Sequence, residues 1–331
     1  MKEFSITFAI GTAAVFALTV AAERILIPIL RSHKLGQKIL DIGPRWHKSK
    51  EGTPIMGGLG FILAALVVMA VFFVVRGIQG RGADYIPLAL TLGLAVGNGA
   101  IGFVDDYCKL VKKQNEGLTW KQKLFLQLAL ATAYVVVMAY TGNLSTSVNL
   151  PFTDRTLYLG WGVYPLSVII LAGVTNGGNI TDGVDGLASG VTFVIGGFFA
   201  VWAFSMQSEQ VGAVGAILIG ASLGFLVYNF HPAKVFMGDT GSLFFGSLVI
   251  GTAFMMREPI VGLIVAAVFI LEMLSSLLQV VYFRLTHGKR LFKMAPVHHH
   301  FEQSGWGENR IVLTFSLTEA LFCVLAWFAL H

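Results

Sequence analysis

The residues best suited to chemistry in this sequence are five aspartates in three short motifs. Asp105 and Asp106 are adjacent, Asp182 and Asp185 lie three residues apart, and Asp239 stands between glycine and threonine. Mg²⁺ in proteins is held by one or two carboxylates together with water and substrate phosphate oxygens. The pattern therefore predicts a site for a hard cation and a phosphorylated substrate.

Each motif also has a plain structural interpretation. The adjacent carboxylates can mark the water boundary at the end of a membrane helix, with Lys109 four residues after Asp105. The segment around Asp182 can be an ordinary turn, and Asp239 can be the N-cap of a helix, because Asp is a preferred residue there. The acid-beside-glycine pattern recurs, and this repetition favours one shared site.

Basic and aromatic residues surround these motifs. Lys50, Lys121 and Lys123 either set topology and contact anionic lipids or, beside an acidic site, position a diphosphate. Phe236 could pack in the membrane or stack on a nucleobase. The run His298 to His300 lacks the spaced ligands and thiolates usual at zinc sites, so hydrogen bonding to an anionic or uridine-like ligand is favoured.

The elements that must carry these residues are membrane helices. Of 331 residues, 55% are hydrophobic and 12% charged, whereas soluble domains have roughly 25% charged residues. Glu272 and Glu319 each interrupt one apolar run. Counting these two, ten runs are about long enough to span a bilayer: 4–22, 52–75, 85–104, 124–153, 156–181, 186–208, 210–230, 240–256, 259–283 and 311–330. We expect an all-α polytopic membrane protein with about ten transmembrane helices and a single domain, 1–331.

The distribution of Lys and Arg predicts which loops face the cytoplasm. The loops that contain the motifs carry 17 basic residues, and the opposite set carries 5. By the positive-inside rule, the candidate active site is on the cytoplasmic face and both termini are periplasmic. Among the outer loops, 143–159 alternates polar and apolar residues, which predicts a short surface hairpin. Cys108 and Cys323 fall near opposite ends of the spans, so no disulfide is expected.

Five motifs, in this order, resemble those of the polyprenyl-phosphate N-acetylhexosamine-1-phosphate transferase superfamily, and in particular its phospho-N-acetylmuramoyl-pentapeptide transferase branch. They are Gly52-Thr-Pro-Ile-Met-Gly-Gly58, Gly102-Phe-Val-Asp-Asp-Tyr-Cys-Lys109, Asn179-Ile-Thr-Asp-Gly-Val-Asp-Gly-Leu-Ala188, Phe236-Met-Gly-Asp-Thr-Gly-Ser242 and Pro296-Val-His-His-His-Phe-Glu302. The resemblance covers essentially the whole chain. It implies a multi-pass enzyme of the bacterial cytoplasmic (inner) membrane that acts in peptidoglycan synthesis.

The resemblance also implies the reaction and the roles of the residues. Undecaprenyl phosphate would attack UDP-MurNAc-pentapeptide, giving lipid I and UMP with Mg²⁺ as cofactor. Asp105, Asp106 and Asp239 would be catalytic and hold the metal, with Asp239 the foremost ligand and the first two serving as base or metal organiser. The substrate pocket would be formed by Lys50, Lys121, Lys123, Asn179, Asp182, Asp185, Asn229, Phe236, Gln279, His298 and His299.

One residue departs from the family pattern, since Ile55 stands where the family usually has Thr. A hydroxyl contact is lost there, which affects details of nucleotide contact. The expected partners are the donor, the lipid acceptor and the bilayer, with no nucleic acid; a homodimer is left open.

Two other functions are compatible with parts of the pattern. A sister enzyme that transfers GlcNAc-1-phosphate shares the aspartate motifs, and the segment from Pro296 to Glu302 favours the muramoyl-pentapeptide branch instead. An ion-coupled transporter would use Glu272 and Glu319, since acids inside membrane proteins often mark ion paths. Transporter sites lie near the membrane midplane, whereas the polar motifs here gather at one face.

Overall fold

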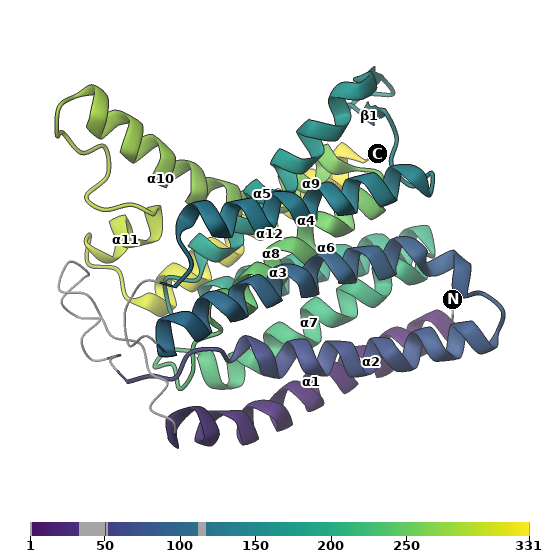
Figure 1. Ribbon diagram of the computed structural model, residues 1–331, viewed down its shortest axis with the longest axis horizontal. Coiled ribbons are helices and arrows are strands. Elements are labelled where there is room, and N and C mark those ends of the chain that lie inside the picture. Colours follow the sequence, from purple (N-terminus) through teal and green to yellow (C-terminus); the bar gives the residue numbers. More distant parts are fainter. Residues whose placement is uncertain (1, 33–49, 51, 112–116, 331) are drawn as a thin grey trace.

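The structure is a computed structural model that describes residues 2–32, 50, 52–111 and 117–330, and these form a bundle of helices (Figure 1). Within these ranges, nine helical segments are long and apolar enough to cross a membrane. The long helices are α1 (Lys2–Ser32), α2 (Gly58–Ile78), α3 (Ile86–Val111), α4 (Trp120–Tyr140), α5 (Val163–Thr181), α6 (Leu187–Met206), α7 (Glu209–Asn229), α8 (Gly238–Met255), α10 (Ala267–Leu285) and α12 (Glu308–Ala329). Shorter helices are η2 (Gly82–Tyr85), η3 (Gly160–Gly162), α9 (Pro259–Val265) and α11 (Val297–Glu302). The all-α polytopic fold expected from the sequence is confirmed.

Helix α8 corresponds to the expected span 240–256, but it is not among the nine described helices that are long and apolar enough to cross a membrane. Its 18 residues pack against α2, α3, α5 and α9, and every side chain from Thr240 to Phe254 is buried. A helix that is covered by other helices can carry polar side chains without exposing them to lipid, and α8 accordingly contains Ser242, Ser247 and Thr252. It is the central helix of the bundle.

The expected span 259–283 is divided into α9 and α10 at Ala266. Glu319 of α12, with 0% of its surface exposed, accepts a hydrogen bond from the backbone nitrogen of Val268 at 2.9 Å. A carboxylate near a helix N-terminus satisfies an otherwise unpaired N–H group and interacts favourably with the helix dipole. Glu319 therefore stabilises the start of α10.

The expected span 124–153 is in fact a helix followed by part of a hairpin. Helix α4 ends at Tyr140, and strand β1 (Ser147–Asn149) pairs antiparallel with β2 (Thr156–Tyr158), with Val148 opposite Leu157. The predicted hairpin in 143–159 is thus confirmed. The two cysteines are free thiols, as expected.

The two ends of the bundle differ in character. Both termini and the β1–β2 hairpin lie toward the right-hand end in Figure 1, while α11 lies at the opposite end. This arrangement agrees with an even number of crossings, namely ten when α8 is counted with the nine helices of the described residues. Which end faces the cytoplasm is a prediction from the distribution of basic residues.

Candidate active site

Asp105, Asp106 and Asp239 come together where the last turns of α3 meet the first turn of α8. An oxygen from each carboxylate lies within 4.8 Å of the other two, and Asp105 and Asp106 are 3% and 2% exposed. The two helices can approach this closely because of Gly102. A Cβ atom at that position would lie 2.2 Å from the carbonyl oxygen of Asp239, so any larger residue would force α3 and α8 apart.

Two lysines neutralise part of this negative charge. Lys109 Nζ lies 2.6 Å from Asp105 Oδ2 and 3.1 Å from Asp239 Oδ2, and Lys123 Nζ of α4 lies 2.8 Å from the same oxygen of Asp239. Three carboxylates thus face two ammonium groups. With all five groups ionised, the cluster retains one negative charge, and its oxygen donors are those that suit Mg²⁺.

Asp106 has a different environment from the other two acids. Its Oδ1 accepts from the backbone nitrogen of Asp239 at 3.2 Å, and its Oδ2 accepts from the nitrogen and hydroxyl of Thr240 at 3.0 and 2.7 Å. These N–H groups belong to the first turn of α8, where backbone N–H groups have no acceptor within the helix. Asp106 therefore caps α8 from the neighbouring helix α3.

Asn179, on the last turns of α5, joins this cluster. Its Nδ2 donates to Asp239 Oδ1 and to Ser242 Oγ, both at 2.8 Å, and its Oδ1 accepts from Lys123 at 3.1 Å. Side chains from α3, α4 and α5 therefore surround the carboxylate of Asp239, which is the most exposed of the three acids at 18% of its side chain.

Asp182 follows directly after α5 and is partly buried. Burial raises its pKa well above the usual range, and the nearby carboxylates of Asp239, Asp106 and Asp185 raise it further, while Lys50 opposes the shift. Asp182 thus experiences the fields of two acidic clusters.

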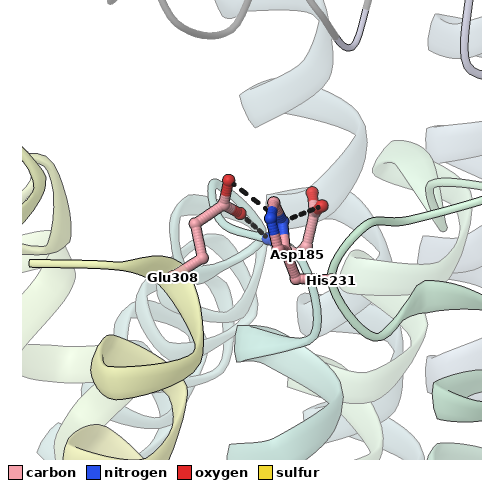
Figure 2. Close-up of side chains that lie close together, drawn as sticks. All are labelled: Asp185, His231 and Glu308. Atoms are coloured by element: carbon pink, nitrogen blue, oxygen red, sulfur yellow. Dashed lines mark hydrogen bonds and ion pairs between the residues drawn. The ribbon is translucent and has the colours of Figure 1, made fainter.

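The second cluster is formed by Asp185, His231 and Glu308 (Figure 2). Lys50 Nζ lies 2.7 Å from both Asp185 Oδ1 and Glu308 Oε2. His231 Nδ1 lies 2.9 Å from Asp185 Oδ2 and 3.3 Å from Glu308 Oε1. With Lys50, the cluster joins four segments that are distant in sequence, and this lysine already balances one of the cluster's carboxylates.

Asn229 is the last residue of α7, and Phe236 lies in the loop that connects α7 to α8. Asn229 is 2% exposed; its Oδ1 accepts from the backbone nitrogen of Gly186 at 3.0 Å and its Nδ2 donates to the carbonyl of Val235 at 2.9 Å. Phe236 is half-buried. Its backbone nitrogen donates to the carbonyl of Pro54, and its carbonyl accepts from the backbone nitrogen of Gly57, both at 2.9 Å. Asn229 therefore holds the Asp185 turn against this loop. Ile55, also in the 52–58 motif, is buried in the apolar core.

Gln279, His298 and His299 come from α10 and α11. Gln279 Oε1 accepts from the backbone nitrogens of Leu291 and Phe292 at 3.1 and 2.9 Å, so it shapes the loop between these helices. The rings of His298 and His299 lie edge to face at 4.2 Å between centroids. The Nδ1 atom of His298 lies 3.0 Å from Glu272, and that of His299 contacts Glu302.

One expected substrate residue lies apart from these clusters, and several contacts were not foreseen. Lys121 is exposed, and its Nζ lies 5.6 Å from the ring centroid of Trp120. Sequence patterns did not indicate Glu308 or His231 as site residues, because a single acid after a turn and a single histidine before a proline are common. Lys109 had a signal, namely its i,i+4 spacing from Asp105.

Comparison with known proteins identifies the family. The model of glycosyl transferase family 4 matches residues 88–257. Phospho-N-acetylmuramoyl-pentapeptide-transferase of Acetivibrio thermocellus is 42% identical over 96% of this chain and 93% of its own length. The proteins of the same name from Halalkalibacterium halodurans and Bacillus subtilis are 44% and 43% identical, over 94% of each chain. This chain belongs to the phospho-N-acetylmuramoyl-pentapeptide-transferase family.

Membership of this family makes the chain a membrane-embedded transferase. It also weighs against the transporter alternative. Glu272 and Glu319, which an ion path would use, are both 0% exposed and are bound to His298 and to the backbone of Val268.

Proposed function

We propose that this protein transfers phospho-MurNAc-pentapeptide from UDP-MurNAc-pentapeptide to undecaprenyl phosphate, giving lipid I and UMP, at the cytoplasmic face of the bacterial inner membrane. The names of the relatives support the transferred group. The observation that carries the chemistry is the cluster of Asp105, Asp106 and Asp239 with Lys109 and Lys123.

The cluster suits Mg²⁺, and its members differ in what they offer. Asp239 and Asp105 would hold the ion, because one oxygen of each is bound to a lysine ammonium group that an ion could replace. Both oxygens of Asp106 instead accept hydrogen bonds from the start of α8. Bound Mg²⁺ would supply positive charge for the donor diphosphate and the departing UMP. Asp106 would act by keeping the first turn of α8, and with it Asp239, in place.

Phosphoryl transfer requires positioning and charge neutralisation more than covalent help from the protein. An oxygen of the lipid phosphate forms a bond to the sugar-proximal phosphorus, and the bond from that phosphorus to the oxygen shared with UMP breaks. A phosphate monoester with a second pKa of about 6 is already an anionic nucleophile at neutral pH. Lys109 and Lys123 lessen the repulsion between the two anions, and Asp105 serves as base or metal organiser.

The donor would bind beside this cluster, on the α5–α6 turn and the surrounding loops. We assign to this pocket the sequence-predicted set of Lys50, Lys121, Lys123, Asn179, Asp182, Asp185, Asn229, Phe236, Gln279, His298 and His299, with Phe236 stacking on uracil. Because Lys50 is shared by Asp185 and Glu308, it can reach an anionic donor only by exchanging one of these partners.

Release of UMP tests this function directly. Purified protein receives undecaprenyl phosphate, Mg²⁺ and either UDP-MurNAc-pentapeptide or UDP-GlcNAc. We expect UMP with the first donor alone. Equal release with UDP-GlcNAc would favour the sister enzyme, and no release with either donor would contradict a transferase of this specificity.

Direct attack by the lipid phosphate is tested by omitting the lipid. Carboxylates form aspartyl-phosphate intermediates in some enzymes, and such an intermediate would let labelled UMP exchange into the donor. We expect no exchange in delipidated enzyme. Rapid lipid-independent exchange would establish a covalent route instead.

A further inference from the structure

Glu272 is a buried carboxylate that the proposed chemistry does not use. It lies on α10 and is 0% exposed, and its Oε2 is 3.0 Å from Nδ1 of His298, which is 1% exposed. Among the described residues, neither the second oxygen of Glu272 nor Nε2 of His298 has a hydrogen-bond partner. Burying an unpaired polar atom costs about 1–3 kcal/mol, so a free imidazole nitrogen at this place calls for a ligand.

The free nitrogen of His298 faces the turn that carries the second acidic motif. A Cβ atom built on Gly183 would lie 2.3 Å from Nε2 and 2.7 Å from Cε1 of His298. The ring edge is therefore in contact with the backbone between Asp182 and Asp185. Glycine at position 183 is what leaves room for the imidazole.

The same turn of α10 also holds the backbone next to His298. Ser275 Oγ donates to the carbonyl of Glu272 at 2.7 Å and accepts from the backbone nitrogen of Val297 at 3.0 Å. His298 is thus attached to α10 twice, through its ring and through the preceding residue. By contrast, His299 binds Glu302 within its own short helix.

We propose that Glu272 is a positioning residue for His298. By accepting the Nδ1–H of a neutral imidazole, the carboxylate fixes the tautomer in which Nε2 is an acceptor. It also holds Nε2 against the Gly183 turn, where it accepts a hydrogen bond from an O–H or N–H group of the donor. The assignment of the ligand rests on the proposed function, and the Glu272–His298 pair itself does not.

A double-mutant cycle tests the coupling. The variants are Glu272→Ala, Glu272→Gln, His298→Ala and the Glu272→Ala/His298→Ala double mutant, measured by UMP release at saturating lipid phosphate. We expect Glu272→Ala to raise the KM for UDP-MurNAc-pentapeptide roughly tenfold, corresponding to one hydrogen bond of about 1.4 kcal/mol. Glu272→Gln retains an oxygen acceptor and should restore most of the affinity. The double mutant should be no worse than His298→Ala alone.

A second readout does not depend on substrate. ¹⁵N NMR of the His298 ring should show the Nδ1–H tautomer in the wild-type protein and its loss in Glu272→Ala. The matched control is Glu319→Gln, which changes another fully buried glutamate whose partner is a backbone nitrogen. It retains an oxygen acceptor for that nitrogen and should leave the donor KM and the His298 tautomer unchanged.

Additive effects in the double mutant, or an unchanged His298 tautomer in Glu272→Ala, would overturn the proposal. If the wild-type protein releases no UMP, the proposed function fails, while the tautomer measurement still decides the role of Glu272. Should Glu272→Ala not fold, Glu272→Asp, with a carboxylate one methylene shorter, replaces it in both measurements.

Discussion

Thr240→Val tests how α3 holds the start of α8. Thr240 is 1% exposed, and its hydroxyl donates to Asp106 Oδ2 at 2.7 Å, while its backbone nitrogen donates to the same oxygen at 3.0 Å. Valine has nearly the same shape and preserves the packing and the backbone bond. The loss is one hydrogen bond to a charged group, which contributes about 1.5–3 kcal/mol. We expect the free energy of unfolding to fall by that amount.

Thr240→Ser is the matched control because it retains the hydroxyl and loses one buried methyl group. That loss costs roughly 0.8 kcal/mol. The valine variant should therefore be less stable than the serine variant, which is the reverse of the order that apolar burial alone predicts. Denaturant unfolding of the detergent-solubilised protein, followed by tryptophan fluorescence, gives the two values.

The same pair of variants links stability to turnover. Because Asp239 immediately precedes Thr240, loosening the first turn of α8 should displace the carboxylate of Asp239 and lower UMP release roughly tenfold in Thr240→Val, equivalent to about 1.4 kcal/mol. Thr240→Ser should remain near the wild-type rate. A valine variant that equals the serine variant in both stability and turnover would refute the capping role of Asp106.

Three further outcomes are expected. Asp239→Asn should reduce UMP release about 100-fold or more while the protein stays folded, because a metal-ligand charge is lost; near-normal turnover at saturating Mg²⁺ would contradict its assignment. The pKa of Asp182 is raised in the folded protein, which means that folding disfavours its ionised form. The contribution of Asp182 to stability is therefore full at low pH and is lost as pH rises through the folded pKa. Asp182→Asn should therefore match the wild type in thermal stability at low pH and exceed it at neutral pH, and a pH-independent difference would exclude this reasoning. In a cysteine-free background, an impermeant thiol reagent applied to intact cells with a permeabilised outer membrane should label a cysteine at Asp154 and spare one at Ser304; the opposite pattern would invert the topology.

Hydropathy predicted those helices whose ends are bounded by polar residues in the sequence itself. The runs 186–208 and 210–230 correspond closely to α6 and α7, because polar residues bound both. The break between α9 and α10 could not be foreseen, since the group that stabilises it, Glu319, comes from α12. A window of sequence contains no information about a partner that arrives from a distant helix.

The same distinction separates the parts of the candidate site. Adjacent acids at a helix end are conspicuous, so Asp105 and Asp106 were foreseeable, although their different environments were not. The hydrogen bonds of Asp106 depend on how α3 and α8 pack together. Likewise the contacts of Lys50 with Glu308 join segments whose proximity exists only in the folded bundle.

The burial of α8 has a consequence for how the protein is made. A helix of 18 residues that carries Asp239 in its first turn and contains several hydroxyl groups has a weak tendency to enter the bilayer alone, where an acidic residue is costly. Its earlier neighbours α2, α3 and α5 leave the ribosome first and offer it a protein-lined place, with Asp106 ready to accept its first N–H groups. Insertion of α8 is therefore expected to depend on the preceding helices. A chain that fails to assemble them would also be expected to lack Asp239 beside Asp105 and Asp106, so the acidic cluster would form only in a bundle whose earlier helices are already in place.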